Sequence, residues 1–170
     1  MKENFIQLNK DDDVLRLEIR TDEGKPTGEY LTFDLEDVEI PLKYQELIEL
    51  IKKNNVNLRN EILVIDKRQD IKGKKLLSKN EEDKLKALQD YYKKQIEAYN
   101  LFLGENGVQK LLNGRKVSWT TLQEIDEIIE KQIAPLLNNT MDNITKKIKE
   151  KYGNFSVKND EQIEVIKWAV

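Results

Sequence analysis

The spacing of apolar residues changes along this chain, from every second residue near its start to every third or fourth residue afterwards. Alternating runs occupy Val14–Arg20 and residues 30–35, and the segment 21–28 between them is dense in turn-forming residues. Successive side chains of a β-strand point to opposite faces, so each run can bury one face. Two such runs joined by a turn-rich segment predict a half-buried β-hairpin.

The alternation continues over residues 38–42 with its phase shifted, which predicts a bulge or a bend at residues 36–37. Pro41 suits the first turn of a helix, and residues 44–65 carry apolar side chains at helical spacing. Residues 54–55, both Asn, interrupt this stripe. The pattern therefore fits either one helix with a polar position in its seam or two helices broken at the asparagines.

Ser78 and Glu81 form a capping-box pattern, in which each side chain bonds the backbone N–H of the other residue. The pattern predicts a helix that begins here, after a stop near Gly73, and that ends at Gly104, a suitable C-terminal cap. The predicted apolar stripe of this helix is Leu85, Leu88, Tyr92, Ile96, Tyr99, Phe102 and Leu103.

Three more helices are predicted from the capping and helix-breaking residues at their ends. A short helix over residues 105–112 is closed by Gly114. The next begins at Ser118 or Thr120, and Pro135 should kink or end it because the proline ring clashes with the preceding turn. A third apolar stripe over residues 137–152 ends at Gly153, and the segment 154–170 fits either a helix or a strand.

These elements predict an α+β fold, mainly α, with an N-terminal β-hairpin packed on an α-helical bundle. We expect one domain over residues 1–153 and a C-terminal tail or extension over residues 154–170. The 170-residue length fits a single domain with such an appendage.

The residue types of many catalytic sites are missing. The chain contains no Cys and no His, which excludes thiolate nucleophiles, imidazole bases and zinc sites of the Cys/His type. Gly104, Gly107 and Lys110 lack the spacing of a phosphate-binding loop. The run of Asp at residues 11–13 lacks the alternating ligands of a calcium loop. We therefore expect no enzymatic activity, no cofactor and no metal.

The charge and hydropathy of the chain limit the classes of partner that it can bind. With 29 basic and 32 acidic residues, the net charge of −3 shows no basic excess of the kind that nucleic-acid binders usually carry. The Lys-rich stretch 67–79 is expected to be a solvated connector; the alternative is a nucleic-acid regulator that uses this stretch and residues 146–151. No signal-like segment and no apolar run of about 20 residues is present, so we expect a cytoplasmic protein without a membrane partner.

Several predicted helices carry Ile, Leu and Tyr stripes opposite charged faces. The simplest interpretation is that these stripes all meet in one core. The functional interpretation is that one stripe, or the edge of the hairpin, remains for a partner, because a small domain with long narrow seams tends to leave apolar surface for association.

Two segments resemble the tail assembly chaperones of long-tailed phages and prophages of Gram-positive bacteria. Residues 103–118 read LGENGVQKLLNGRKVS, and residues 28–42 read GEYLTFDLEDVEIPL. In that family a helix ends in Leu-Gly-Glu, and a small or apolar pair and a turn then lead into another helix. The second segment is similar to the hairpin-to-helix entry of such proteins. The resemblance spans roughly Val14 to Ile133.

The resemblance implies a non-catalytic chaperone that binds the tape measure protein, assists tail tube assembly and acts in the bacterial host cytoplasm. Contacts with the tail tube protein and self-association belong to the same expectation. We expect client contacts at Tyr92, Tyr99, Phe102, Trp119 and Leu122. The alternative function is a structural virion protein, such as a head–tail connector or a tail component.

Overall fold

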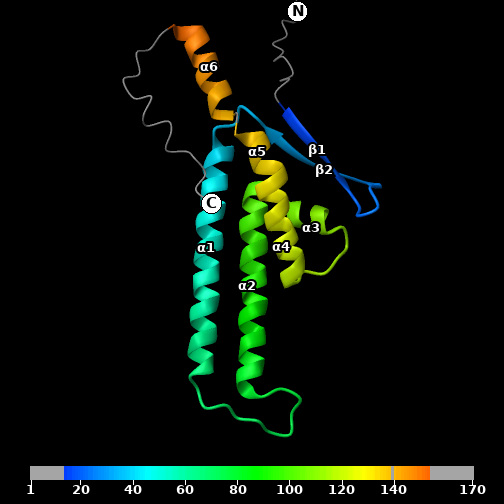
Figure 1. The fold of residues 1–170 in the computed structure, drawn as a ribbon, viewed down its shortest axis with the longest axis vertical. Helices are drawn as coiled ribbons and strands as arrows, with labels where there is room; N and C mark the ends of the chain where they lie inside the picture. Colours follow the sequence, from blue (N-terminus) through cyan, green and yellow to red (C-terminus); the bar gives the residue numbers. More distant parts are fainter. Residues whose placement is uncertain (1–13, 139, 154–170) are drawn as a thin grey trace, which may run out of the picture.

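The computed structural model describes residues 14–138 and 140–153 and has the expected α+β architecture, mainly α, with an N-terminal β-hairpin on a helical bundle (Figure 1). The predicted acidic start at residues 11–13 and the tail at 154–170 lie outside the described residues. The elements are β1 (Val14–Arg20), β2 (Pro26–Asp34), α1 (Glu39–Asp66), α2 (Lys79–Leu103), α3 (Gly107–Leu112), α4 (Trp119–Ile128), the π-helical turn η1 (Ile129–Ile133), α5 (Ala134–Leu137) and α6 (Thr140–Tyr152).

The predicted hairpin is confirmed. Strands β1 and β2 pair antiparallel, with Leu15 opposite Phe33 and Leu17 opposite Leu31. The second strand begins at Pro26, earlier than the alternation indicates, because the turn closes within a few residues by a bond from Thr21 N–H to the Lys25 carbonyl. The inner face of the hairpin lies on the helices.

The third alternating run does not form a strand. Of the bulge or bend predicted at residues 36–37, the structure has a turn, closed by a hydrogen bond from the Asp37 N–H to the Asp34 carbonyl at 3.1 Å. Helix α1 already begins at Glu39, whose backbone N–H donates to the Asp37 carboxylate at 2.9 Å. Pro41 lies in the first turn, where its missing N–H would have no helical acceptor. Ile40 is buried while Val38 and Leu42 are exposed. The alternation over residues 38–42 therefore reflects one buried residue in the first turn of α1 and not a third strand.

Helix α1 is continuous through the two asparagines. Asn54 is buried, and its side-chain amide donates to the Gln95 side-chain carbonyl of α2 at 2.8 Å. The Gln95 amide in turn donates to the Tyr91 hydroxyl at 3.1 Å. Of the two alternatives, one helix with a polar position in its seam is therefore the structure observed.

The Ser78 capping box at the start of α2 and the Gly104 cap at its end are both confirmed. The predicted apolar face is wrong at Leu85, which is 53% exposed, whereas Leu88 is partly buried and packs against the core. Ala87, Tyr91, Gln95 and Ala98 are buried instead. The small alanine side chains permit close approach of α1, and periodicity alone does not reveal this choice of face.

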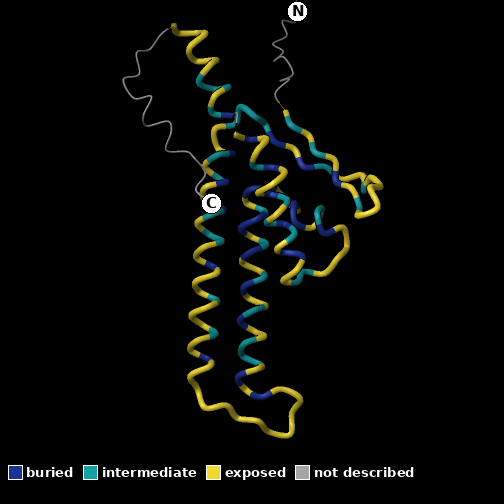
Figure 2. Tube along the Cα trace, viewed as in Figure 1, coloured by how far each residue is buried: buried dark blue, intermediate teal, exposed yellow. Residues whose placement is uncertain are grey.

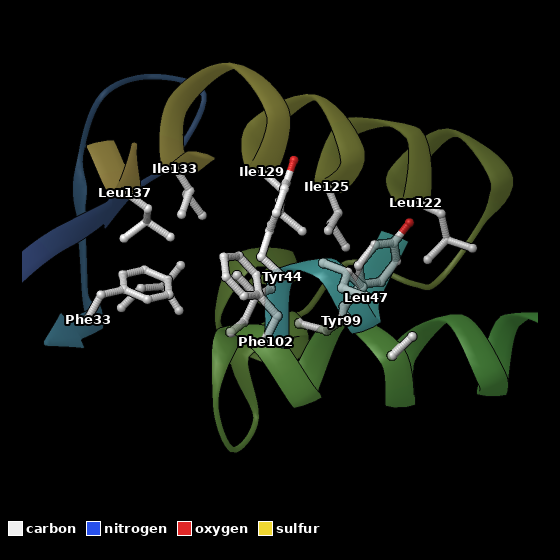
Figure 3. Packing of buried hydrophobic residues seen from close by; sticks show 14 of the residues in the cluster. Phe33, Tyr44, Leu47, Tyr99, Phe102, Leu122, Ile125, Ile129, Ile133 and Leu137 are labelled. Carbon is white, nitrogen blue, oxygen red and sulfur yellow. The ribbon is translucent and has the colours of Figure 1, made fainter. Parts of the chain in front are cut away.

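The core lies where the first part of α1, the second half of α2, the hairpin and the shorter helices meet (Figure 2). The Phe102 ring contacts Phe33 and Tyr44, with centroid separations of 5.6 Å and 5.3 Å. Figure 3 shows a row of aliphatic side chains from α4, η1 and α5 pointing toward these aromatic rings. That row is Leu122, Ile125, Ile129, Ile133 and Leu137, all buried.

The predicted interruption near Pro135 is confirmed as the π-helical turn η1. Proline cannot donate the next helical hydrogen bond, and the Ala134 N–H reaches back five residues to the Ile129 carbonyl. The chain then continues through α5 to α6. Helix α6 ends before Gly153 as predicted, although Ile148 and Tyr152 of its apolar stripe are exposed.

Candidate partner-binding groove

A groove of about 430 Å³ lies between α1 and α4, with α2 contributing one residue to its lining. Figure 1 shows α4 beside only the upper part of α2, while α1 and α2 continue together to their connecting loop. Among the described residues, the lower part of this helical pair therefore has no third helix over it. The lining residues are Asn55, Leu58, Arg59, Ile62 and Leu63 of α1, Tyr91 of α2, and Trp119, Leu122, Gln123 and Asp126 of α4.

Trp119 is the first residue of α4 and presents an aromatic surface to the groove. Its side chain is 48% exposed, and its ring stacks on Tyr91 at a centroid separation of 5.8 Å. The start of α4 is fixed by reciprocal bonds between Ser118 and Thr121: the Ser118 N–H donates to the Thr121 hydroxyl, and the Thr121 N–H donates to the Ser118 hydroxyl. The position of the indole is therefore set by the cap and by the stacking.

Tyr91 links the groove to the polar seam between α1 and α2. Its hydroxyl donates to the Asn55 side-chain carbonyl at 2.7 Å and accepts from the Gln95 amide. Burial raises the pKa of the Tyr91 hydroxyl, and the charge of Asp126 adds to this effect. The hydroxyl therefore remains protonated and holds its donor bond at neutral pH.

Asp126 supplies the carboxylate of the groove. Its Oδ1 accepts a hydrogen bond of 2.6 Å from the hydroxyl of Tyr99, a fully buried residue of α2. Burial raises the pKa of the Asp126 carboxyl; the Tyr99 bond opposes that shift, and the charge of Glu130 reinforces it. Within the described part of the chain, no basic side chain forms an ion pair with Asp126.

The predicted contact residues are divided between the groove and the core. Trp119 and Leu122 both line the groove, but only Trp119 is largely exposed, at 48%, whereas Leu122 is 4% exposed and belongs to the core. Tyr99 and Phe102 are buried at 0% and 5% exposure, so their rings are not available to a partner. Tyr92 is half-buried against the core and does not line the groove.

The remaining groove residues were not predicted from the sequence. Leu58 and Ile62 belong to the recognised α1 stripe, but the stripe does not show which of its members stay accessible. Asp126 lies one turn after Leu122 and next to buried Ile125, and this position at the border of an apolar stripe is a usable signal. Tyr91 lies outside the predicted stripe of α2, so its role depends on the observed helix orientation.

The two basic stretches lie far apart. The loop that contains most of residues 67–79 joins α1 and α2 at one end of the molecule, whereas residues 146–151 belong to α6 at the other end (Figure 1). In the first stretch, Arg68 and Lys79 both form ion pairs with Asp83. The two stretches therefore do not form one continuous basic surface.

The glycines near Lys110 lie at helix ends: Gly104 is the C-terminal cap of α2, and Gly107 is the first residue of α3. Gly104 has φ 92° and ψ 177°, a conformation essentially restricted to glycine. A Cβ on Gly107 would collide with the Cβ of Leu103. Across residues 14–138 and 140–153, no cluster of acidic side chains suited to a metal ion is found, and no helix is long and apolar enough to cross a membrane.

Comparisons of the chain with protein-family models, with curated proteins and with solved structures gave no match. The features of the molecule that bear on its function are therefore the groove, the exposure of its residues and the charges along it.

Proposed function

We propose that this protein is a non-catalytic phage or prophage tail assembly chaperone, which binds the tape measure protein in the groove between α1 and α4 and assists tail tube assembly. The observation that carries this proposal is the exposed apolar lining of the groove. Leu63 on the α1 wall and Trp119, the first residue of α4, are 47% and 48% exposed and both line the groove.

An amphipathic helix is the client that suits this surface best. Helices α1 and α2 pack side by side along their length, and α4 occupies the position of a third helix over only part of it. A client helix packed beside α4, in the groove between α4 and α1, would bury the exposed groove residues of both helices. A long helical tape measure protein offers many such segments, so modest affinity at each one is multiplied by the number of copies bound.

The proposal is tested by co-expression with the tape measure protein of the same phage. We expect a soluble complex with the wild-type chain and a weakened complex with Leu63→Ser or Trp119→Ser. Ile148→Ser is the matched control, because Ile148 is also 48% exposed but lies on α6, away from the groove. The proposal is refuted if the tape measure protein stays insoluble with the wild-type chain and nothing co-purifies.

The alternative of a structural virion protein is favoured by one observation. The sheet has only two strands within the described residues, so both strands have an unpaired edge. Open edges permit strand addition between neighbouring subunits of an assembly. Mass spectrometry of purified particles separates the two functions: a structural protein is present in fixed copy number, and a chaperone is absent.

A further inference from the structure

We infer that the groove selects amphipathic helices that place a lysine or arginine of their apolar face against Asp126. This inference rests on the proposed client-binding function of the groove and specifies the chemistry of the client. It begins from the acidic residues of α4. Glu124 forms an ion pair with Arg115, and Glu127 forms one with Lys131. Asp126, between them in sequence, faces the groove and has no basic partner among the described residues.

The Asp126 carboxylate has unused capacity to accept hydrogen bonds. A carboxylate offers about four acceptor positions, whereas Asp126 accepts one bond, from the Tyr99 hydroxyl. A client ammonium or guanidinium in the groove would add charge-assisted bonds at the remaining positions, and such bonds are stronger than those between neutral groups. An apolar or acidic client side chain at this place would remove water from the carboxylate without supplying a donor in its place.

The other groups around Asp126 favour the same choice. Tyr99 and Tyr91 approach it from α2 with hydroxyl groups, and Glu130 on η1 adds negative charge. Arg59 of α1 lines the same groove, but its side chain is exposed and makes no ion pair with Asp126. The long Arg59 side chain can extend its guanidinium into solvent or toward an acidic client residue, so a cation can still reach Asp126.

The position of Asp126 relative to the apolar lining gives a spacing in the client. Asp126 lies one turn after Leu122 and seven residues after Trp119 on the same helix. Seven residues span about 10.5 Å along a helix axis. A client helix packed beside α4 would therefore carry its basic residue about seven positions from the aliphatic residue that meets Trp119, with another aliphatic residue near the midpoint to meet Leu122 and Leu58.

The test uses two synthetic amphipathic peptides of about 20 residues, long enough to form a helix. One peptide has a leucine face that includes a single lysine seven positions from a leucine; the other has norleucine at the lysine position. Norleucine has a similar length but no charge, so a purely apolar groove would prefer it. Binding is measured on the full-length chain with Trp168→Phe, which leaves Trp119 as the only tryptophan and so as the fluorescent reporter.

We expect the wild-type groove to bind the lysine peptide about tenfold or more tightly than the norleucine peptide. Asp126→Asn should abolish this preference, and Glu127→Gln, which removes a charge from the exposed face of the same helix, should retain it. Tyr99→Phe, which removes the hydroxyl but keeps the Asp126 carboxylate, should also retain the preference. The inference is wrong if the wild type prefers norleucine or if Asp126→Asn keeps the preference for lysine.

The co-expression assay separates this inference from the proposed function. If the tape measure protein co-purifies equally with the wild type and Asp126→Asn, the chaperone proposal stands and the role of Asp126 is refuted. If it co-purifies with neither and neither peptide binds, both are refuted. Sedimentation of the chain alone tests another occupant: a dimer that Leu63→Ser dissociates would assign the groove to a second copy and overturn the client assignment.

Discussion

Replacement of Gln95 by leucine tests whether the polar seam between α1 and α2 stabilises the fold. Gln95 is 1% exposed; its carbonyl accepts from the Asn54 amide at 2.8 Å, and its amide donates to the Tyr91 hydroxyl. Gln95→Leu leaves the buried Asn54 amide without its partner, while Tyr91 keeps its bond to Asn55. An unsatisfied buried donor costs about 1–3 kcal/mol. We expect a loss of about 1–2 kcal/mol, because the added leucine offsets part of that cost.

The double replacement Asn54→Leu with Gln95→Leu distinguishes this reasoning from a simple loss of packing. When both partners become apolar, no donor remains unsatisfied, so the double variant should be more stable than Gln95→Leu alone. Urea unfolding monitored by far-ultraviolet circular dichroism measures these differences in the free energy of unfolding, provided that the dependence of this free energy on urea concentration is the same for all variants. Asn57→Leu on the exposed face of α1 is the control and should stay within about 0.5 kcal/mol of wild type. Additive losses in the double variant would refute the reasoning.

Three further changes have defined outcomes. Gly104→Ala should lower the free energy of unfolding by about 1–3 kcal/mol, because its φ of 92° strains any side chain; an unchanged melting temperature would contradict this. Ser78→Ala should cost about 1 kcal/mol in the same melts by removing the capping box, and Lys75→Ala in the adjoining exposed loop serves as control. The raised folded-state pKa of Asp126 makes wild-type stability fall as pH rises from 3.8 through that pKa. Asp126→Asn should therefore be more stable than wild type at neutral pH, an advantage that shrinks as pH falls toward 3.8; a difference independent of pH in urea titrations would contradict this.

The predictions that the structure confirms depend on short-range interactions. The capping box joins Ser78 to a residue three positions away, and the Gly104 cap closes the turn before it. The hairpin follows from alternation within single strands and a turn-rich connection. Pro135 interrupts its helix because of its own ring and its missing N–H. Each signal lies within a few residues of its effect, so a single sequence is enough to read it.

The predictions that were wrong concern residues 38–42 and the apolar face of α2, where a short sequence pattern fits two structures. Ile40 fits the buried side of either a strand or a helix, and its helical state depends on Asp37 and Pro41 nearby. On α2, the stripe that begins at Leu85 competes with a face that contains Ala87 and Gln95. The second face is buried because α1 packs there, and α1 carries Asn54 as the partner of Gln95.

The sequence by itself therefore determined the local elements of this protein: the hairpin, the ends of the helices, the break near Pro135 and the absence of Cys and His chemistry. Only the tertiary structure decided that Tyr99 and Phe102 are buried while Trp119 remains accessible beside the uncovered part of α1 and α2. It also decided that Asp126 is partly desolvated and, among residues 14–138 and 140–153, has no basic partner. The physical reason is that capping and periodicity act within about one helical turn, whereas exposure depends on how far each helix extends along neighbours that are distant in sequence.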